Sequence, residues 1–294
     1  MFTGVVALGD GGWIVLRIYI LFNLGKLVLP ASRSPQQVAQ AIAKHQVETP
    51  TTSPSFLNLL LLGDALTRYD LKSLQVINYG TEPMPESLLK SLNVKLPWVK
   101  LLQAYGLTET GVLPVKSVSS SSTWLTFDTS KCDIRIVEGL LEVKIATSML
   151  GYINAPSPFT ADGYLKTGDA VLQQGDRYRV LGRESDLINV GGEKVYPGEI
   201  ENVLRDMPGV IEVAVTSLDN PIMGQVVGAA FKLQDVESMS TFRRRLYEFC
   251  HLKLQSSHIP RKILISDDML HTMRAKKIGS NVLRAKMTEK RSFV

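Results

Sequence analysis

Over the first 110 residues, apolar positions alternate between helical spacing and short continuous runs. A helix is expected to start at Ser34-Pro35, because serine is a good N-cap and proline fits the first helical turn. The predicted elements are, in order, a helix to residue 46, a strand over 75–79, a helix over 85–92 and a strand over 99–103. Strands that alternate with helices indicate a largely parallel sheet.

The pattern changes after residue 112 and again after residue 183. Short strand-like runs at 133–137, 140–145 and 177–181, without helical spacing, predict a β-rich part over about 112–183, and the polar stretch 117–122 is expected to be a mobile connection. Beyond residue 186, a helix from Pro197, strands over 210–216 and 226–233, and a helix over 241–254 predict an α+β domain. We therefore expect two domains, 1–183 and 187–294.

Composition excludes several classes of protein. The chain has 294 residues, of which 45% are hydrophobic and 21% charged, so it is globular rather than disordered. Two cysteines exclude a disulfide framework and a four-cysteine zinc site, and they are typical of a reduced, cytoplasmic protein. The net charge of +5 is too diffuse to indicate nucleic-acid binding. The apolar run 13–30 contains Arg17 and Lys26, so we interpret it as buried helix and strand rather than a membrane span.

Two loops carry candidate chemistry. Residues 105–110 follow a strand, the usual ligand position in a parallel sheet. Tyr105 could stack on a base, Thr108 could bond a phosphate and Glu109 could hold Mg²⁺, although a structural turn with a core tyrosine explains the same residues. Lys166 to Asp169 forms a second predicted turn, in which Asp169 could accept hydrogen bonds from a ribose diol; a plain Gly-Asp turn is the alternative.

The order of several pieces along the chain is more informative than any one of them. The pieces are Tyr79-Gly80-Thr81-Glu82-Pro83, then residues 105–109, 163–169, 182–186 and 191–201, and finally Lys276-Lys277-Ile278. Together they resemble the adenylate-forming (AMP-binding) superfamily, and residues 191–201 resemble acyl-CoA synthetases most. The resemblance covers about residues 35–290.

The resemblance implies a fold and a reaction. The α/β fold would be the C-terminal part of the large adenylate-forming domain, a parallel-sheet region plus a small β-barrel over about 112–183. A small, mobile α+β lid domain would follow, with a hinge near 183–187. In the reaction, ATP and Mg²⁺ convert a carboxylic acid into an acyl-adenylate. The acyl group then passes to CoA or to the phosphopantetheine of an acyl-carrier protein.

The resemblance also implies roles for individual residues of the large domain. The adenine pocket would be lined by Gly80, Thr81 and Glu82, with Tyr105 stacking on the base. The phosphate, Mg²⁺ and ribose would be contacted by Thr108, Glu109 and Asp169, respectively, with Arg183 near the ribose.

In the small domain, the hinge would fall at Ser185-Asp186, Gly192 would line the thiol channel, and Lys277 would bridge the carboxylate and the α-phosphate. Ser185 stands where the family usually has aspartate or lysine. Lys276 replaces the glycine usual before the lysine, and Ser280 replaces the arginine usual three residues after it.

The front of the chain departs from the family pattern. Neither Gly9-Asp10-Gly11-Gly12 nor residues 51–55 match its Ser/Thr/Gly-rich phosphate loop that ends in lysine. We expect the chain to open inside the large domain and a separate N-terminal polypeptide to be a possible partner. Three hypotheses follow: a ligase, natively short or completed by that partner; a non-catalytic remnant that binds AMP, acyl-adenylate or a carrier protein; and an interaction protein without a ligand.

Overall fold

The computed structural model describes residues 3–6, 20, 22–267, 270 and 279–289. Within it the chain forms two compact units, Met1–Val180 and Leu181–Val294. Strand β13 (Arg177–Arg183) crosses the boundary between them. Each unit is described by itself.

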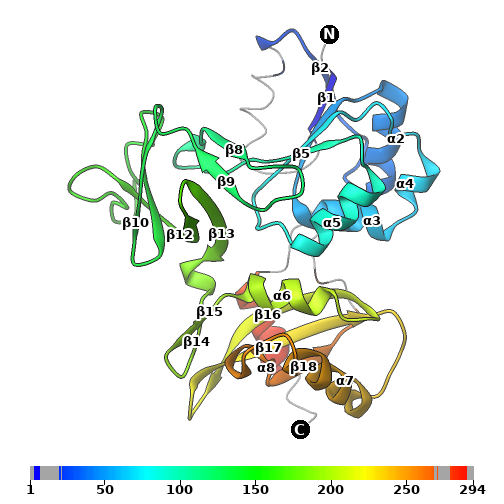
Figure 1. Cartoon of the computed structure of the whole chain (residues 1–294), viewed down its shortest axis with the longest axis vertical. Helices are drawn as coiled ribbons and strands as arrows, with labels where there is room; N and C mark the ends of the chain where they lie inside the picture. Colours follow the sequence, from blue (N-terminus) through cyan, green and yellow to red (C-terminus); the bar gives the residue numbers. More distant parts are fainter. Residues whose placement is uncertain (1–2, 7–19, 21, 268–269, 271–278, 290–294) are drawn as a thin grey trace. The chain divides into compact units, whose positions relative to one another are not determined.

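A five-stranded sheet, ordered β2-β1-β3-β4-β5, forms the first part of unit 1 (Figure 1). Its strands all pair in parallel, as the alternating pattern predicts. Its strands are β1 (Thr3–Val6), β2 (Lys26–Val28), β3 (Thr49–Thr52), β4 (Val76–Tyr79) and β5 (Lys100–Gln103). Of the apolar run 13–30, β2 is described as a strand, while residues 13–19 and 21 lie outside the described residues.

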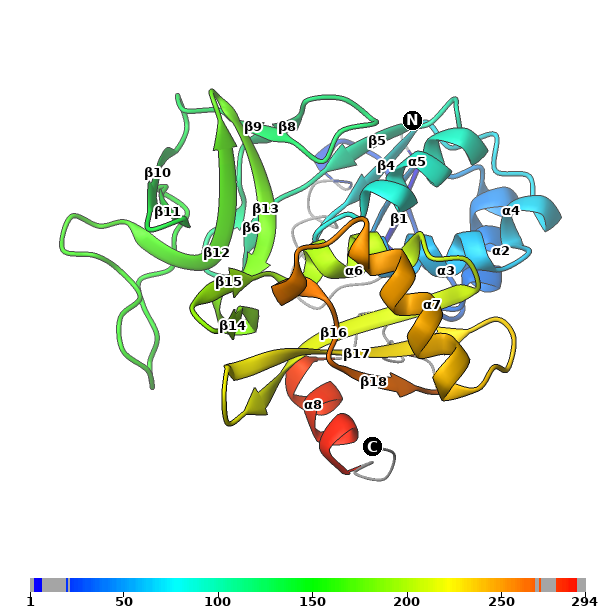
Figure 2. The ribbon, with the colours of Figure 1, turned by 60° about the horizontal axis from the view of Figure 1, so that its bottom comes forward.

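Four helices, which contact one another, lie beside this sheet (Figure 2). They are α2 (Pro35–His45), α3 (Pro54–Leu62), α4 (Ala65–Arg68) and α5 (Glu86–Lys95). The predicted cap of α2 is present, because the Ser34 side chain accepts from the N–H of Gln37. The sequence signature of Ser53-Pro54 is the same, and Ser53 caps α3. Among the described residues, no helix is long and apolar enough to cross a membrane.

A six-stranded antiparallel sheet, ordered β10-β11-β12-β13-β9-β8, forms the second part of unit 1. Besides β13 it contains β8 (Val115–Ser117), β9 (Leu125–Phe127), β10 (Asp133–Val137), β11 (Leu140–Lys144) and β12 (Leu165–Gln174). The sheet curls around a core that includes Leu125, Leu141 and Leu165. Its edge strands β10 and β8 do not pair, so the predicted barrel-like part is an open half-barrel.

The polar stretch 117–122 is tied to the parallel sheet rather than being a loose connection. The Ser117 hydroxyl accepts from the N–H of Gln103 at 2.6 Å, and the Ser120 hydroxyl accepts from the N–H of Leu101 at 3.2 Å. Both N–H groups belong to β5, the edge strand. The serine hydroxyls therefore accept from the backbone N–H groups on the outer side of β5, where no further strand of this sheet lies.

Unit 2 is a sheet packed with helices. Its strands run β15-β14-β17-β16, and β18 adds to β17 in parallel. The elements are a 3₁₀ turn η1 (Glu184–Asp186), β14 (Ile188–Val190), β15 (Glu193–Val195), α6 (Pro197–Arg205), β16 (Val210–Asn220), β17 (Gly224–Leu233), α7 (Met239–His251), η2 (Ser256–His258), β18 (Lys262–Ile265) and α8 (Ser280–Glu289). Its core includes Phe231 and Phe242, whose rings meet edge-on at 4.8 Å. The predicted hinge at 183–187 stays a prediction.

Candidate functional site

The carboxyl ends of β4 and β5 bring two of the predicted motifs together. Residues 80–82 follow β4 directly, Tyr105 comes two residues after β5, and the two strands pair in parallel. Their ends therefore share one edge of the sheet, where parallel sheets bind ligands. Gly80 is needed for this approach, because a Cβ there would lie 2.6 Å from the carbonyl oxygen of Ala104. Thr81 adopts a left-handed φ of 71° in the same turn.

Buried polar oxygens lie in register beside these turns. Thr52, Tyr79 and Gln103 are neighbours on β3, β4 and β5. Each has a buried side-chain oxygen with no hydrogen-bond partner among the described residues. Burial also raises the pKa of the Tyr79 phenol to about 12, so the hydroxyl stays protonated. Buried polar atoms need water or a ligand to satisfy them, so this edge of the sheet can accept a polar molecule.

The carboxylate of Glu82 is bound to the start of helix α3. Its Oε2 accepts from the N–H of Ser55 at 3.1 Å and from the Ser55 hydroxyl at 2.6 Å. A carboxylate near the N-terminus of a helix is stabilised by the free N–H groups there. The interaction anchors the 80–82 turn. Ser55 was not among the predicted site residues.

The clearest pairing in the site joins Tyr105 to Asp169. The phenol of Tyr105 donates to Oδ2 of Asp169 at 2.6 Å, across 64 residues of sequence. Asp169 is buried, with 5% of its surface exposed. The ring of Phe127 packs edge-on against the ring of Tyr105, with 6.0 Å between the ring centroids. Two residues assigned to the adenine and to the ribose thus lie within one hydrogen bond of each other.

The prediction that Lys166 to Asp169 form a turn is wrong. These residues lie inside strand β12, which continues to Gln174. The register with β11 shifts there, and Gly168 has a left-handed φ of 68°. A glycine with positive φ inside a strand makes a bulge, which bends the strand without reversing it. Asp169 therefore projects from a sheet rather than from a loop.

Thr108 and Glu109 occupy the tip between two short strands, β6 (Gly106–Leu107) and β7 (Gly111–Val112). Thr108 is exposed and Glu109 is half-buried. The hydroxyl of Tyr152 donates to Oε1 of Glu109 at 2.6 Å, and the N–H of Met149 donates to the Glu109 carbonyl at 2.7 Å. The loop that carries Tyr152 is thereby attached to the predicted metal-binding residue.

The surroundings of Glu109 fit a magnesium ion held mainly by phosphate and water. The described residues contain no group of three or more histidine, cysteine, aspartate or glutamate side chains suited to a metal. Mg²⁺ commonly takes only one or two carboxylates and completes its shell with substrate phosphates and water. One half-buried carboxylate beside an exposed threonine matches that donor set.

The remaining predicted residues belong to unit 2. Arg183 is exposed at the end of β13, and Ser185 and Asp186 lie in η1. Asp186 accepts from the Ser280 hydroxyl at 2.7 Å. Gly192, with a φ of 95°, lies in the turn between β14 and β15, and its N–H donates to Asn189 at 2.9 Å. Lys277, like residues 9–12, lies outside the described residues.

Comparison with known proteins identifies the family. Residues 10–165 match the AMP-binding enzyme family, and residues 199–277 match the AMP-binding enzyme C-terminal domain. An L-proline–[L-prolyl-carrier protein] ligase of Pseudomonas fluorescens is 30% identical over 86% of this chain and 54% of its own length. A long-chain-fatty-acid–CoA ligase of Mycobacterium tuberculosis is 28% identical over 73% of this chain and 45% of its own length. The chain thus spans about half the length of these relatives.

Solved structures agree with the fold. The o-succinylbenzoate CoA synthetase of Bacillus subtilis, in complex with the acyl-adenylate intermediate OSB-AMP, superposes with a TM-score of 0.76 at 26% identity. The match covers 96% of this chain and 60% of that chain. The resemblance and the fold class expected from it are confirmed. The chain belongs to the AMP-binding, adenylate-forming superfamily.

Proposed function

We propose that this chain supplies the adenylate-binding part of an AMP-forming acid–thiol ligase. The observation that carries the proposal is the hydrogen bond from Tyr105 to the buried carboxylate of Asp169, at the ligand-binding edge of the parallel sheet. The relatives named above comprise ligases for CoA and for a carrier protein, which supports a thiol as the acyl acceptor. Neither acceptor is favoured over the other.

The reaction would have two steps. A carboxylate oxygen of the acid attacks the α-phosphorus of ATP, the bond to the β-phosphate oxygen breaks, and pyrophosphate leaves. The thiol sulfur then attacks the carbonyl carbon of the acyl-adenylate, loses its proton, and expels AMP. Both steps develop negative charge on phosphate or carbonyl oxygens, so fixed hydrogen-bond donors and cations lower their barriers.

The described residues of unit 1 suit the nucleotide end of this reaction. Asp169 would accept hydrogen bonds from the ribose hydroxyls, because a carboxylate accepts several donors at once. The ring of Tyr105 and the turn 80–82 would contact the adenine, and the Thr108 hydroxyl would bond a phosphate. Glu109 would hold Mg²⁺, which neutralises phosphate charge when it is bound.

Unit 2 would supply the mobile part. Arg183 would add a cation near the ribose, and Ser185-Asp186 would form the pivot between the two half-reactions. Gly192 would line the thiol channel, and Lys277 would bridge the acid and the α-phosphate. These four assignments rest on the family resemblance.

Calorimetric titration of the full chain with AMP and with Mg·ATP tests the site. Asp169→Asn keeps the size of the side chain and an acceptor for Tyr105 but removes the charge. We expect AMP affinity to fall about tenfold or more, because the two ribose hydroxyls bind a charged acceptor more strongly than a neutral one. The matched control is Asp176→Asn, at an exposed aspartate of the same unit. Equal affinities in wild type and Asp169→Asn would refute the assignment.

Pyrophosphate release separates a ligase from a module that only binds adenylate. The full chain is incubated with Mg·ATP, CoA and a panel of aliphatic, aromatic and amino acids. Acid-dependent release that Asp169→Asn abolishes supports the ligase. AMP binding without release for any acid, also after addition of the N-terminal half of a relative, supports the non-catalytic binding module instead.

A further inference from the structure

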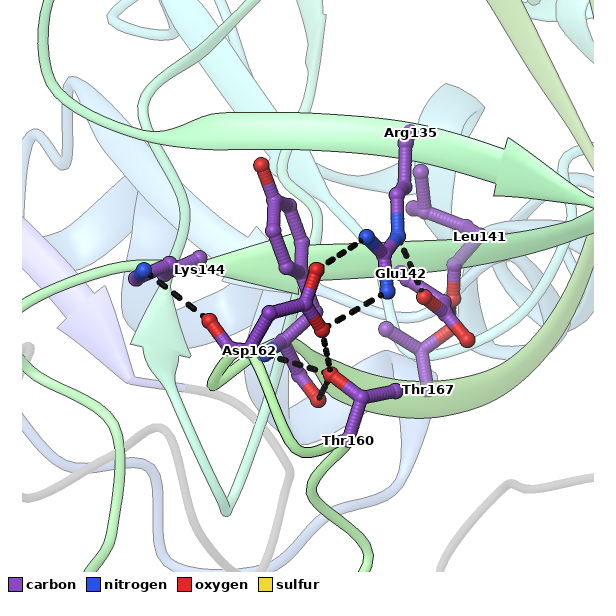
Figure 3. A network of polar contacts seen from close by, with 8 residues as sticks. Arg135, Leu141, Glu142, Lys144, Thr160, Asp162 and Thr167 are labelled. Carbon is purple, nitrogen blue, oxygen red and sulfur yellow. Dashed lines mark hydrogen bonds and ion pairs between the residues drawn. The ribbon is translucent and has the colours of Figure 1, made fainter.

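The hydroxyl of Thr167 links two strands beside Asp169. Its oxygen donates to the carbonyl of Leu141 on β11 at 2.7 Å and accepts from the backbone N–H of Asp169 at 3.0 Å. Figure 3 shows Thr167 lying next to Leu141. The residue is buried, with 5% of its surface exposed. A hydroxyl can donate and accept at once, which neither valine nor alanine can do at this position.

This link sits in the irregular part of the sheet. Leu140 pairs with Ala170 and Glu142 pairs with Lys166, so four steps along β12 oppose two steps along β11. Residues in such a bulge fall outside the regular ladder of backbone hydrogen bonds. Thr167 provides the bulged N–H of Asp169 with an acceptor, and it ties that acceptor to the neighbouring strand. Thr167 thereby joins the backbone of Asp169 to β11.

We propose that Thr167 is a positioning residue for ribose recognition. It acts through Asp169, whose carboxylate it keeps directed at the Tyr105 hydroxyl and at the ribose diol. The inference rests on the proposed function, because it presupposes that Asp169 binds the ribose. It predicts that removing the Thr167 hydroxyl weakens recognition of the ribose hydroxyls in particular, not nucleotide binding in general.

Thr160 provides a matched control in the same region of the sheet (Figure 3). Its hydroxyl also donates and accepts at once: it lies 2.6 Å from Oδ1 of Asp162 and 3.2 Å from the carbonyl of Tyr164 as a donor, and it accepts from the N–H of Tyr164 at 2.9 Å. None of these partners is a predicted nucleotide contact. Thr160→Val therefore removes the same chemical group from a half-buried position and leaves the Thr167–Asp169 link in place.

The experiment compares AMP with 2′,3′-dideoxy-AMP, which lacks both ribose hydroxyls. Calorimetry on the full chain gives the ratio of the two affinities for wild type, Thr167→Val, Thr167→Ser and Thr160→Val. We expect wild type to prefer AMP by about tenfold or more, as hydrogen bonds to a carboxylate allow. Thr167→Val should reduce the preference to below about threefold with dideoxy affinity unchanged, while Thr167→Ser and Thr160→Val should keep it.

Each other outcome overturns a defined part of the reasoning. A full preference in Thr167→Val, or an equal loss in Thr160→Val, means that Thr167 has no special role in positioning. Equal losses for both nucleotides in Thr167→Val mean that its role is structural only. Wild type that binds neither nucleotide, or binds both equally, refutes the proposed ribose site and the inference with it. Should Thr167→Val fail to fold, Thr167→Ala is measured against the same control.

Discussion

Removing the Tyr105 hydroxyl should destabilise unit 1 far more than removing the Tyr152 hydroxyl, although the two hydrogen bonds have the same length. Both phenols donate to a carboxylate at 2.6 Å, Tyr105 to Asp169 and Tyr152 to Glu109. The two bonds differ in how well they are shielded from water. The acceptor of the first, Asp169, is 5% exposed, whereas the donor of the second, Tyr152, is 45% exposed. Water readily replaces the hydrogen bond that Tyr152 makes, whereas Asp169 is shielded from it.

The size of the difference follows from burial. A hydrogen bond to a buried charged group contributes about 1.5–3 kcal/mol to the free energy of unfolding. An exposed polar substitution changes it by less than about 0.5 kcal/mol. With a urea slope of about 3 kcal/mol/M, Tyr105→Phe should lower the unfolding midpoint by about 0.5–1 M and Tyr152→Phe by less than about 0.2 M.

Tryptophan fluorescence can follow unit 1 alone, because Trp13, Trp98 and Trp124 all belong to it. Urea titrations of Tyr105→Phe, Asp169→Ala and the double variant give the coupling between the two side chains. A coupling above about 1 kcal/mol is expected, since residues in direct contact are not additive. Equal midpoints for Tyr105→Phe and Tyr152→Phe, or additive single variants, would refute the argument that burial sets the strength of this bond.

Three further predictions follow from contacts and pKa values. Ser55→Ala removes the hydroxyl that binds Glu82 at 2.6 Å and should lower the stability of unit 1 by about 0.5–1.5 kcal/mol in the same urea assay; no change would contradict it. Burial raises the pKa of the Cys250 thiol to about 11, so its stabilising contribution is present below the unfolded value of about 8.5 and is lost as the pH rises through 11. At pH 8, Cys250 should therefore react with a disulfide reagent only as fast as unit 2 opens, and reaction at the rate of a free thiol would contradict this. Hydrogen bonds from Arg135 and then Thr160 hold the pKa of the Asp162 carboxyl well below its usual range, so its contribution is present above about pH 4 and lost as the pH falls. Asp162→Asn should accordingly flatten the acid limb of the stability profile, and an unchanged limb would contradict the assignment.

Local sequence signals predicted much of the fold, because capping and periodicity act within a few residues. Ser34-Pro35 marked α2 correctly, and the runs at 75–79 and 99–103 became β4 and β5. The same capping signature at Ser53-Pro54 marks α3, a helix absent from the elements predicted above. Helix α3 provides the N-terminus that binds Glu82. Because the helix is not predicted, the contact of Ser55 with Glu82 is not predicted either.

The bulge in β12 shows a limit of glycine as a signal. Gly168 before Asp169 is typical of a turn, and its left-handed φ is what a turn would use. A positive φ does not by itself say whether the chain reverses or continues, since bulges and turns both require it. The pairing with β11 shows that the chain continues as a strand, because Lys166 before the glycine and Ala170 after it both pair with β11.

Two of the three residues that orient the candidate carboxylates lie outside the motifs that identify the site. Glu82, Glu109 and Asp169 belong to recognised motifs, but their side-chain or backbone partners include Ser55, Tyr152 and Thr167, of which only Thr167 belongs to a motif. Ser55 and Tyr152 stand 27 and 43 residues from the carboxylates they bind. A motif specifies which chemistry is present because that chemistry needs particular residue types. Orientation needs only some donor at the right place, and serine, threonine and tyrosine all supply a hydroxyl. Sequence pattern can therefore predict the carboxylates of this site, whereas the hydroxyls of Ser55 and Tyr152 that bind two of them follow only from the fold.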